Sequence, residues 1–345
     1  MKYKLLAVST VPAINIGDYV QALASSQFYP RIDGFIEREK IDDYHEDVCK
    51  MIMNGYYMHD GNHWPPSEKI LPLLVAIHIN SLVRSKFATK ESLDFFKKYE
   101  PIGCRDYDTM DYLRDRGIDA YFSGCLTLTL GYKYRFNGVR SGVYFVDPKV
   151  TFINKFEKLG YYLLSLLNSK TVNTIGLKWF DHDILRADER SRVMKFYTKY
   201  KALFSKKTLL CSDYIQQENS IYNTRFLNNE DRLAEAERLV VLYSKAELVV
   251  TSRIHCALPC LGIETPVLFI DNKEQAEWSS CRLRGLLELF NVLEWSNKGL
   301  KATFPINGKI SDVNHPQNKS TWKPLAKALI EKCHSFIVKD CGILD

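Results

Sequence analysis

The chain has 345 residues, of which 46% are hydrophobic and 26% are charged, and its formal net charge is +6. This length suits two domains, because single cores stop growing at about 250–300 residues, and the composition excludes a disordered or low-complexity protein. The positive charge is modest and is not gathered into one tract, which argues against a nucleic-acid-binding protein.

Strand-length apolar runs alternate with helical patterns in the first half, which indicates a parallel sheet covered by helices. We predict strands at 4–9, 48–54, 73–79, 101–104 and 120–123, and helices at 90–99 and 106–116. Asp106 is suited to cap the second of these helices, and Gly117 to end it.

The periodic pattern lapses between Gly131 and Gly142, and we place a domain boundary there, giving domains 1–138 and 139–320. In the second half we predict strands at 142–146, 172–177, 208–211, 248–251 and 267–270, and helices at 151–167, 190–204, 231–244 and 254–261. The last segment, 321–345, contains a predicted helix at about 323–338 that we expect to cross back onto the first domain. The sequence therefore predicts an α/β fold of two doubly wound, Rossmann-like domains that face each other across a cleft.

The cysteines and the chain start indicate a cytoplasmic protein. Nine cysteines are scattered and odd in number, which suits reduced, structural thiols, Cys256 and Cys260 included. The opening apolar stretch lacks a convincing cleavage site, and no run reaches the roughly 18 apolar residues of a membrane helix. The basic stretch Lys195–Lys207 is interpreted as the solvated face of a surface helix, in preference to a contact with an anionic membrane.

The junction after the predicted strand 248–251 is a candidate anion site, because ligands of parallel sheets bind at the carboxyl ends of strands. It delivers Arg253, which can bind a carboxylate or phosphate bidentately, and His255, which titrates near neutrality. Taken alone, the pattern equally fits an Arg253 paired with a structural carboxylate and a His255 buried in the core.

Two other segments have simpler explanations. Asp18 followed by Gln21 fits a capping box at the start of a helix, with Gly17 in a special turn. His59 and His63 lie in a loop without a clear third ligand, so we predict no metal site.

Three motifs in order resemble the polysaccharide pyruvyl transferase family over nearly the whole chain. The first is Asn15 to Asp18 with Gln21, the second runs from Pro101 through Arg105 and Asp106 to Ser123-Gly-Cys125, and the third is Ala246 to His255. Many members carry an Asp-Pro pair where this chain has Ser123-Gly-Cys125, which places it in a divergent branch.

The resemblance implies a GT-B-like arrangement, phosphoenolpyruvate as donor without any further cofactor, and a sugar acceptor, often lipid-linked or capsular. It implies that Arg253 and His255 belong to the donor site, and it is compatible with peripheral attachment to a membrane. Our candidate catalytic residues are His255, as acid or base, and Asp18, which can orient or deprotonate an acceptor hydroxyl. The candidate substrate-binding residues are Arg253, Asn15, Gly17, Gln21, Arg105, Asn54, Cys125, Thr127 and Ser252.

Several alternatives stay open at this point. Arg105 fits a surface ion pair with an acid such as Asp108 as well as it fits an anion site. A glycosyltransferase that uses a sugar nucleotide would share the architecture, and so would a sugar-binding or assembly protein that has lost turnover.

Overall fold

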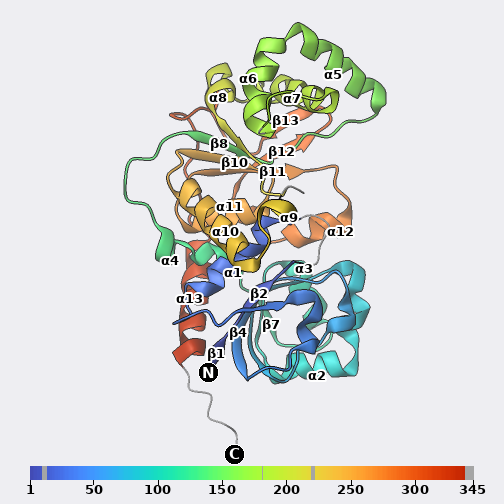
Figure 1. Cartoon of the computed structure of the whole chain (residues 1–345), viewed down its shortest axis with the longest axis vertical. Coiled ribbons are helices and arrows are strands. Elements are labelled where there is room, and N and C mark those ends of the chain that lie inside the picture. Colours follow the sequence, from blue (N-terminus) through green and yellow to red (C-terminus); the bar gives the residue numbers. More distant parts are fainter. Residues whose placement is uncertain (10–13, 181, 219–221, 339–345) are drawn as a thin grey trace, which may run out of the picture.

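The computed structural model describes residues 1–9, 14–180, 182–218 and 222–338, and its two larger sheets lie one in each half of the chain (Figure 1). The fold is α/β, with Rossmann-like parallel sheets covered by helices, as predicted. The division into domains 1–138 and 139–320 stays a prediction.

The first sheet has five parallel strands in the order β1-β4-β5-β6-β7. The strand bounds are Lys2–Tyr3, Cys49–Tyr57, Ile70–Ile79, Ile102–Cys104 and Ala120–Phe122. The helices between these strands are η1 (Arg38–Asp43), η2 (Gly61–His63), η3 (Ser81–Ala88), α2 (Lys90–Lys98) and α3 (Tyr107–Arg114). Asp106 caps α3 by accepting from the Thr109 backbone N–H at 2.9 Å, and Gly117 follows the helix with a positive φ of 73°, so both predicted helix signals are confirmed.

The strand predicted at 4–9 is β2 (Leu5–Ala7), which pairs in parallel with β3 (Phe35–Glu37) in a small separate sheet. The short β1, just before the predicted strand, lies in the five-stranded sheet. Helix α1 (Ile16–Ser26) follows and is buried along most of its length.

The second sheet has six strands in the order β13-β12-β11-β10-β8-β9, all parallel except the edge strand β13. In chain order from β8 to β13 the bounds are Val143–Val146, Asp213–Ile215, Leu248–Thr251, Val267–Asn272, Asn291–Ser296 and Gly299–Ala302. The helices from η4 to α9 are η4 (Leu126–Thr129), α4 (Gly131–Tyr134), α5 (Lys155–Leu167), α6 (Ser169–Phe180), α7 (Ala187–Tyr200), α8 (Lys206–Cys211) and α9 (Tyr222–Arg225). Those after α9 are α10 (Asn229–Ser244), α11 (Ile254–Gly262), α12 (Glu277–Ser280), η5 (Cys281–Leu283), η6 (Leu287–Leu289) and α13 (Lys323–Val338).

The strands predicted at 172–177 and 208–211 are wrong, because both segments are helical. In α6 the buried residues Val172, Ile175, Gly176 and Trp179 recur at intervals of three and four, which is the helical period. In α8 the Ser205 hydroxyl accepts from the Thr208 backbone N–H at 3.0 Å and so caps a short helix.

The basic stretch 195–207 is also not one solvated helix. It joins the end of α7 to the start of α8, and Lys195 is fully buried, with its Nζ 2.6 Å from Glu157 Oε1.

One hydrophobic core connects the two halves of the chain, since α1 packs against α10 and α11 as well as against its own sheet. Helix α13 returns from the end of the chain to the first sheet, where it contacts β5 (Figure 1). The Lys50 Nζ donates to the Phe336 carbonyl at 2.9 Å and ties α13 to β4.

None of the eight described cysteines forms a disulfide, in agreement with the prediction of reduced thiols; Cys341 lies outside the described residues. Among the described helices, none combines the length and the apolar character that a bilayer span requires.

Candidate active site

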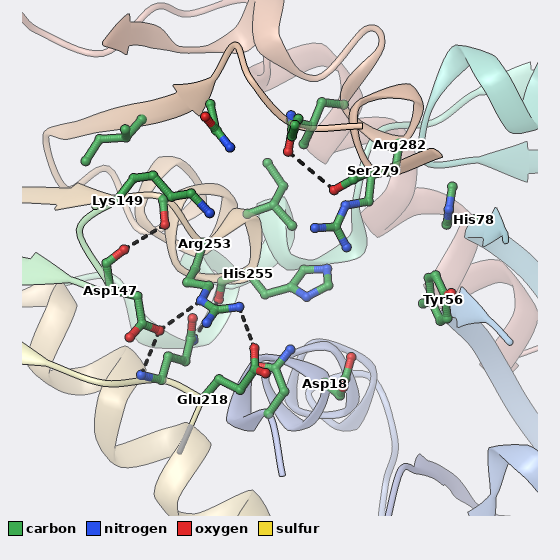
Figure 2. A pocket seen from close by; sticks show the side chains of 18 of the residues that line it. Asp18, Tyr56, His78, Asp147, Lys149, Glu218, Arg253, His255, Ser279 and Arg282 are labelled. Carbon is green, nitrogen blue, oxygen red and sulfur yellow. Dashed lines mark hydrogen bonds and ion pairs between the residues drawn. The ribbon is translucent and has the colours of Figure 1, made fainter. Parts of the chain in front are cut away.

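A cavity of about 1310 Å³ lies where the carboxyl ends of strands from both sheets converge. From the first sheet it receives Tyr56 of β4, His78 of β5 and Arg105, which directly follows β6. From the second sheet it receives Asp147, which follows β8, and the Ser252–His255 segment, which follows β10 (Figure 2). This cavity therefore lies at the carboxyl ends of the strands, which is the position predicted for the ligand site.

Arg253 precedes α11 and is committed to two ion pairs. Its Nε lies 2.9 Å from Asp147 Oδ2, and its Nη1 lies 2.5 Å from Glu218 Oε2. Burial raises the pKa of Asp147, although the Arg253 charge opposes that shift, and the two carboxylates keep the pKa of Arg253 raised despite burial. Arg253 thus lines the cavity while pairing with carboxylates, so both interpretations of the sequence describe part of its environment.

His255 lies in the first turn of α11, almost fully buried, with its Nε2 3.3 Å from Arg105 Nη1. A guanidinium can only donate, so Nε2 accepts and Nδ1 carries the proton of the neutral ring. Burial, reinforced by the charges of Arg105 and Arg282, lowers the pKa of His255 well below its usual value. In the ligand-free protein His255 is therefore a neutral imidazole at pH 7.

Arg105 is almost fully buried, so the predicted alternative of a surface ion pair with Asp108 is wrong. Asp108 pairs instead with Arg84 and, at 3.7 Å, with Arg284. The Arg105 Nε is 3.8 Å from Asp106 Oδ2 and has no hydrogen-bond acceptor among the described residues. Arg105 consequently keeps donor capacity that a ligand can use.

Asp106 organises the base of the site. Its carboxylate caps α3 and accepts a 2.7 Å hydrogen bond from His78 Nδ1. Burial is the largest influence on His78 and lowers its pKa. For Asp106, burial acts to raise the pKa, but the interactions with His78, Arg105 and the Thr109 backbone N–H outweigh burial and lower it. This buried pair holds the strand end from which Arg105 projects.

The start of α1 forms one wall, and here the predicted capping box is wrong. The N-cap is Asn15, whose Oδ1 accepts from the Gly17 backbone N–H at 3.0 Å, while Asp18 lies inside the first turn. The Gln21 Nε2 donates to Asp18 Oδ1 at 3.2 Å. Burial raises the pKa of Asp18, although Arg38 and Arg105 oppose the shift. Asp18 is therefore free of a capping duty and faces the cavity.

Of the candidate residues, Asn15, Asp18, Arg105, Ser252, Arg253 and His255 line the cavity. Gly17 packs behind His255, and a Cβ placed on it would lie 3.0 Å from the His255 Cβ. Gln21 and Asn54 connect α1 to β4, where Asn54 Nδ2 donates to the Gln21 carbonyl at 3.1 Å. Cys125 and Thr127 are fully buried. The side chains of Gln21, Asn54, Cys125 and Thr127 do not line the cavity.

The sequence reasoning missed Lys149 and Arg282, which also line the cavity. Burial lowers the pKa of both cations. Neither has an ion-pair partner among the described residues, and the Arg282 Nε has no acceptor there. Lys149 comes shortly after the carboxyl end of β8, so the argument that placed Arg253 at a strand end could also have found Lys149. Arg282 lies in the short helix η5, and no sequence motif marks it.

His63 lines the same cavity, and its ring and the carboxylates of Asp42 and Asp43 place their ligand atoms within 4.8 Å of one another. His63 Nδ1 is already 2.7 Å from Asp42 Oδ1, so an internal hydrogen bond accounts for the arrangement. His59 is not part of this group.

Comparison with known proteins identifies the family. A family model of polysaccharide pyruvyl transferases matches residues 15–274, which is 260 of the 345 residues. The chain belongs to the polysaccharide pyruvyl transferase family. The matched range begins at Asn15 and includes Arg105, Lys149 and His255, so it spans all three motifs that suggested the family from the sequence. No curated protein and no solved structure gives a significant match.

The family to which the chain belongs is a family of transferases. Arg282 lies beyond the matched range although it shares the cavity with Arg105 and His255. Its place at the site comes from the structure alone.

Proposed function

We propose that this protein transfers the pyruvyl group of phosphoenolpyruvate to two hydroxyls of a sugar, forming a ketal in a cell-surface or capsular polysaccharide precursor. Family membership supports the transferase class. The two halves of the chain would form the domains of a GT-B-like enzyme, with the cavity as their cleft and the donor on the second-domain side.

The observation that carries the proposal is a group of cavity cations that lack a close carboxylate partner among the described residues. Arg105, Lys149 and Arg282 reach it from three segments, and none forms a close ion pair in the part of the chain that the structure describes. Partly buried charges of one sign are costly without a counter-charge, so the site favours an anionic ligand. Phosphoenolpyruvate, with its carboxylate and phosphate, supplies that charge.

The reaction needs one proton to be added to the donor and one proton to be removed from each of the two sugar hydroxyls. A proton is added to the terminal enol carbon while the first sugar hydroxyl forms a C–O bond to the adjacent carbon and loses its proton. The second hydroxyl then forms the other C–O bond and loses its proton as the C–O bond to phosphate breaks. The products are the cyclic ketal and inorganic phosphate, so a general acid and a general base are both required.

His255 and Asp18 suit these two roles. Bound phosphoenolpyruvate would offset the charges of Arg105 and Arg282, which help to hold the pKa of His255 down, so the imidazole would gain a proton that it can deliver to the enol carbon. Asp18, whose pKa is raised by burial, is a better proton acceptor than an ordinary aspartate and would take the proton of a hydroxyl.

The proposal is tested by incubating the protein with phosphoenolpyruvate and a panel of sugar and lipid-linked oligosaccharide acceptors. Phosphate release should require an acceptor, and the acceptor should gain the mass of one pyruvyl ketal. Transfer of a sugar from a nucleotide sugar, with no reaction of phosphoenolpyruvate, would replace the proposal with the glycosyltransferase alternative.

A further inference from the structure

Helix α5 carries its apolar residues on the side that faces away from the protein. Phe156, Leu159, Leu163 and Leu167 recur every three or four residues and are exposed, Phe156 and Leu167 to 85%. We define the outer face of α5 as Phe156, Leu159, Leu163, Leu164, Leu166 and Leu167. Isolated exposed leucines are common, but a continuous apolar face on one helix marks an interaction surface.

The inner side of α5 is mainly polar, and Tyr161 is the α5 residue that packs against the hydrophobic core. α5 packs on α7 and α6, and the residue buried on this side is Ser165, whose hydroxyl donates to the Tyr162 carbonyl at 2.6 Å. Glu157 pairs with Lys195 of α7, and Lys158 pairs with Asp188. These polar contacts and Tyr161 attach the helix to the protein, and its leucines remain exposed for a partner.

The charges around the outer face are positive. Lys155 begins α5 and Lys170 follows its end, and both are exposed with no acidic partner among the described residues. Lys158 and Lys178 pair with Asp188 and Asp213, so Lys155 and Lys170 are the lysines beside this face that carry unpaired charge. Exposed apolar residues bounded by lysines are the pattern of a helix that lies in the surface of an anionic membrane.

We propose that the outer face of α5 binds the surface of an anionic lipid membrane. A second copy that docked through the same face would bring the unpaired Lys155 and Lys170 of both copies together, so charge favours an anionic lipid surface. Figure 1 shows α5 at the outer end of the molecule, beyond α7 and the six-stranded sheet, where a flat surface can reach it.

The helices beside α5 also contribute to the cavity, Trp179 from α6 and Arg192 from α7. A protein held at the membrane by α5 would therefore keep the cavity near a lipid-linked sugar. The role of membrane binding in bringing the cavity to a lipid-linked sugar rests on the proposed function, whereas membrane binding by α5 does not.

The test is flotation of the full chain with vesicles made of equal parts phosphatidylcholine and phosphatidylglycerol. The wild-type protein should float with these vesicles and less with pure phosphatidylcholine, and added salt should weaken binding. Phe156→Gln/Leu163→Gln should lower the partition coefficient by about tenfold or more, because each large apolar side chain contributes strongly to insertion. Val139→Gln/Val313→Gln is the matched control, because both valines are highly exposed and lie outside α5.

Wild-type protein that stays with the lipid-free fraction, or a control pair that loses binding equally, would overturn the inference. So would sedimentation showing a wild-type dimer that Phe156→Gln/Leu163→Gln separates, because the face would then belong to a second copy. Thermal melts by circular dichroism verify that the variants fold. If vesicles bind but no acceptor is pyruvylated, the membrane contact stands and the proposed function fails.

Discussion

Single residues acquire their chemistry in this cavity from neighbours that are distant in sequence. His255 lies 3.3 Å from Arg105, which is 150 residues earlier, and this contact helps to keep the imidazole neutral. The sequence showed that Arg105, Asp18 and His255 follow or begin regular elements. It did not show that the three converge, because convergence depends on how two sheets are oriented.

Asp18→Asn separates chemistry from helix capping. Asn15 caps α1, so the substitution should leave the helix cap intact, and loss of a partly buried carboxylate should not lower the free energy of unfolding. If Asp18 accepts a proton, kcat should fall by roughly 100-fold or more with little change in the KM for phosphoenolpyruvate. Asn15→Ala is the contrasting variant and should cost about 1 kcal/mol of stability through the lost cap. Full activity of Asp18→Asn would remove Asp18 from the mechanism.

His255 gives stability a defined dependence on pH. Its folded-state pKa is depressed below 6.5, so the unfolded chain binds a proton that the folded chain rejects, and stability falls as the pH drops below about 6.5. The slope from this one proton is at most about 1.4 kcal/mol per pH unit. Urea denaturation between pH 7 and pH 5 should show a smaller slope for His255→Gln than for the wild type. His78, whose pKa is also lowered, is present in both proteins and contributes to both slopes. Identical slopes for the two proteins would contradict a neutral His255.

At the scale of elements, α1 and α11 fit together only because position 17 has no side chain. Gly17→Ala would place a Cβ 2.9 Å from Asn15 Oδ1 and 3.0 Å from His255 Cβ, so the helix start or the histidine must move. We expect a loss of about 1–3 kcal/mol and a fall in activity.

Gly160→Ala is the matched control, because the added methyl in α5 meets nothing within 4 Å. This change should be neutral or should stabilise by up to about 1 kcal/mol. Denaturation curves of the two variants provide the comparison, and equal stability of both would show that Gly17 is not under steric constraint.

Helices and strands could be predicted from the sequence where neighbouring residues determine them. The cap at Asp106 and the strand 248–251 are determined by adjacent residues, and both occur in the structure. The segments 172–177 and 208–211 were mistaken for strands because their β-branched and leucine-rich runs are short, and the buried helical period of α6 appears only over a longer window. Helix α5 was predicted from the sequence, but the outward direction of its apolar face depends on tertiary packing.

At the scale of the whole molecule, two parallel sheets direct their strand ends into one cavity, and α1 joins their cores. The alternation of strands and helices made the α/β fold predictable, and three motifs in order made the family predictable. Arg282 was not predictable, since it lies in a short irregular helix after the last motif.

The most direct test of the proposed function is a thermal-shift titration of the protein with phosphoenolpyruvate, with nucleotide sugars as the comparison. A ligand at about 100 times its Kd adds about 2.7 kcal/mol to the free energy of unfolding, so phosphoenolpyruvate should raise Tm while nucleotide sugars should not. Arg282→Gln should leave the ligand-free protein as stable or more stable, because an unpaired, half-buried cation is removed, and should abolish most of the shift. Arg31→Gln, an exposed arginine outside the cavity, should preserve the shift. A Tm that phosphoenolpyruvate leaves unchanged, or a shift that Arg282→Gln retains in full, would contradict the assignment of this cavity as the donor site.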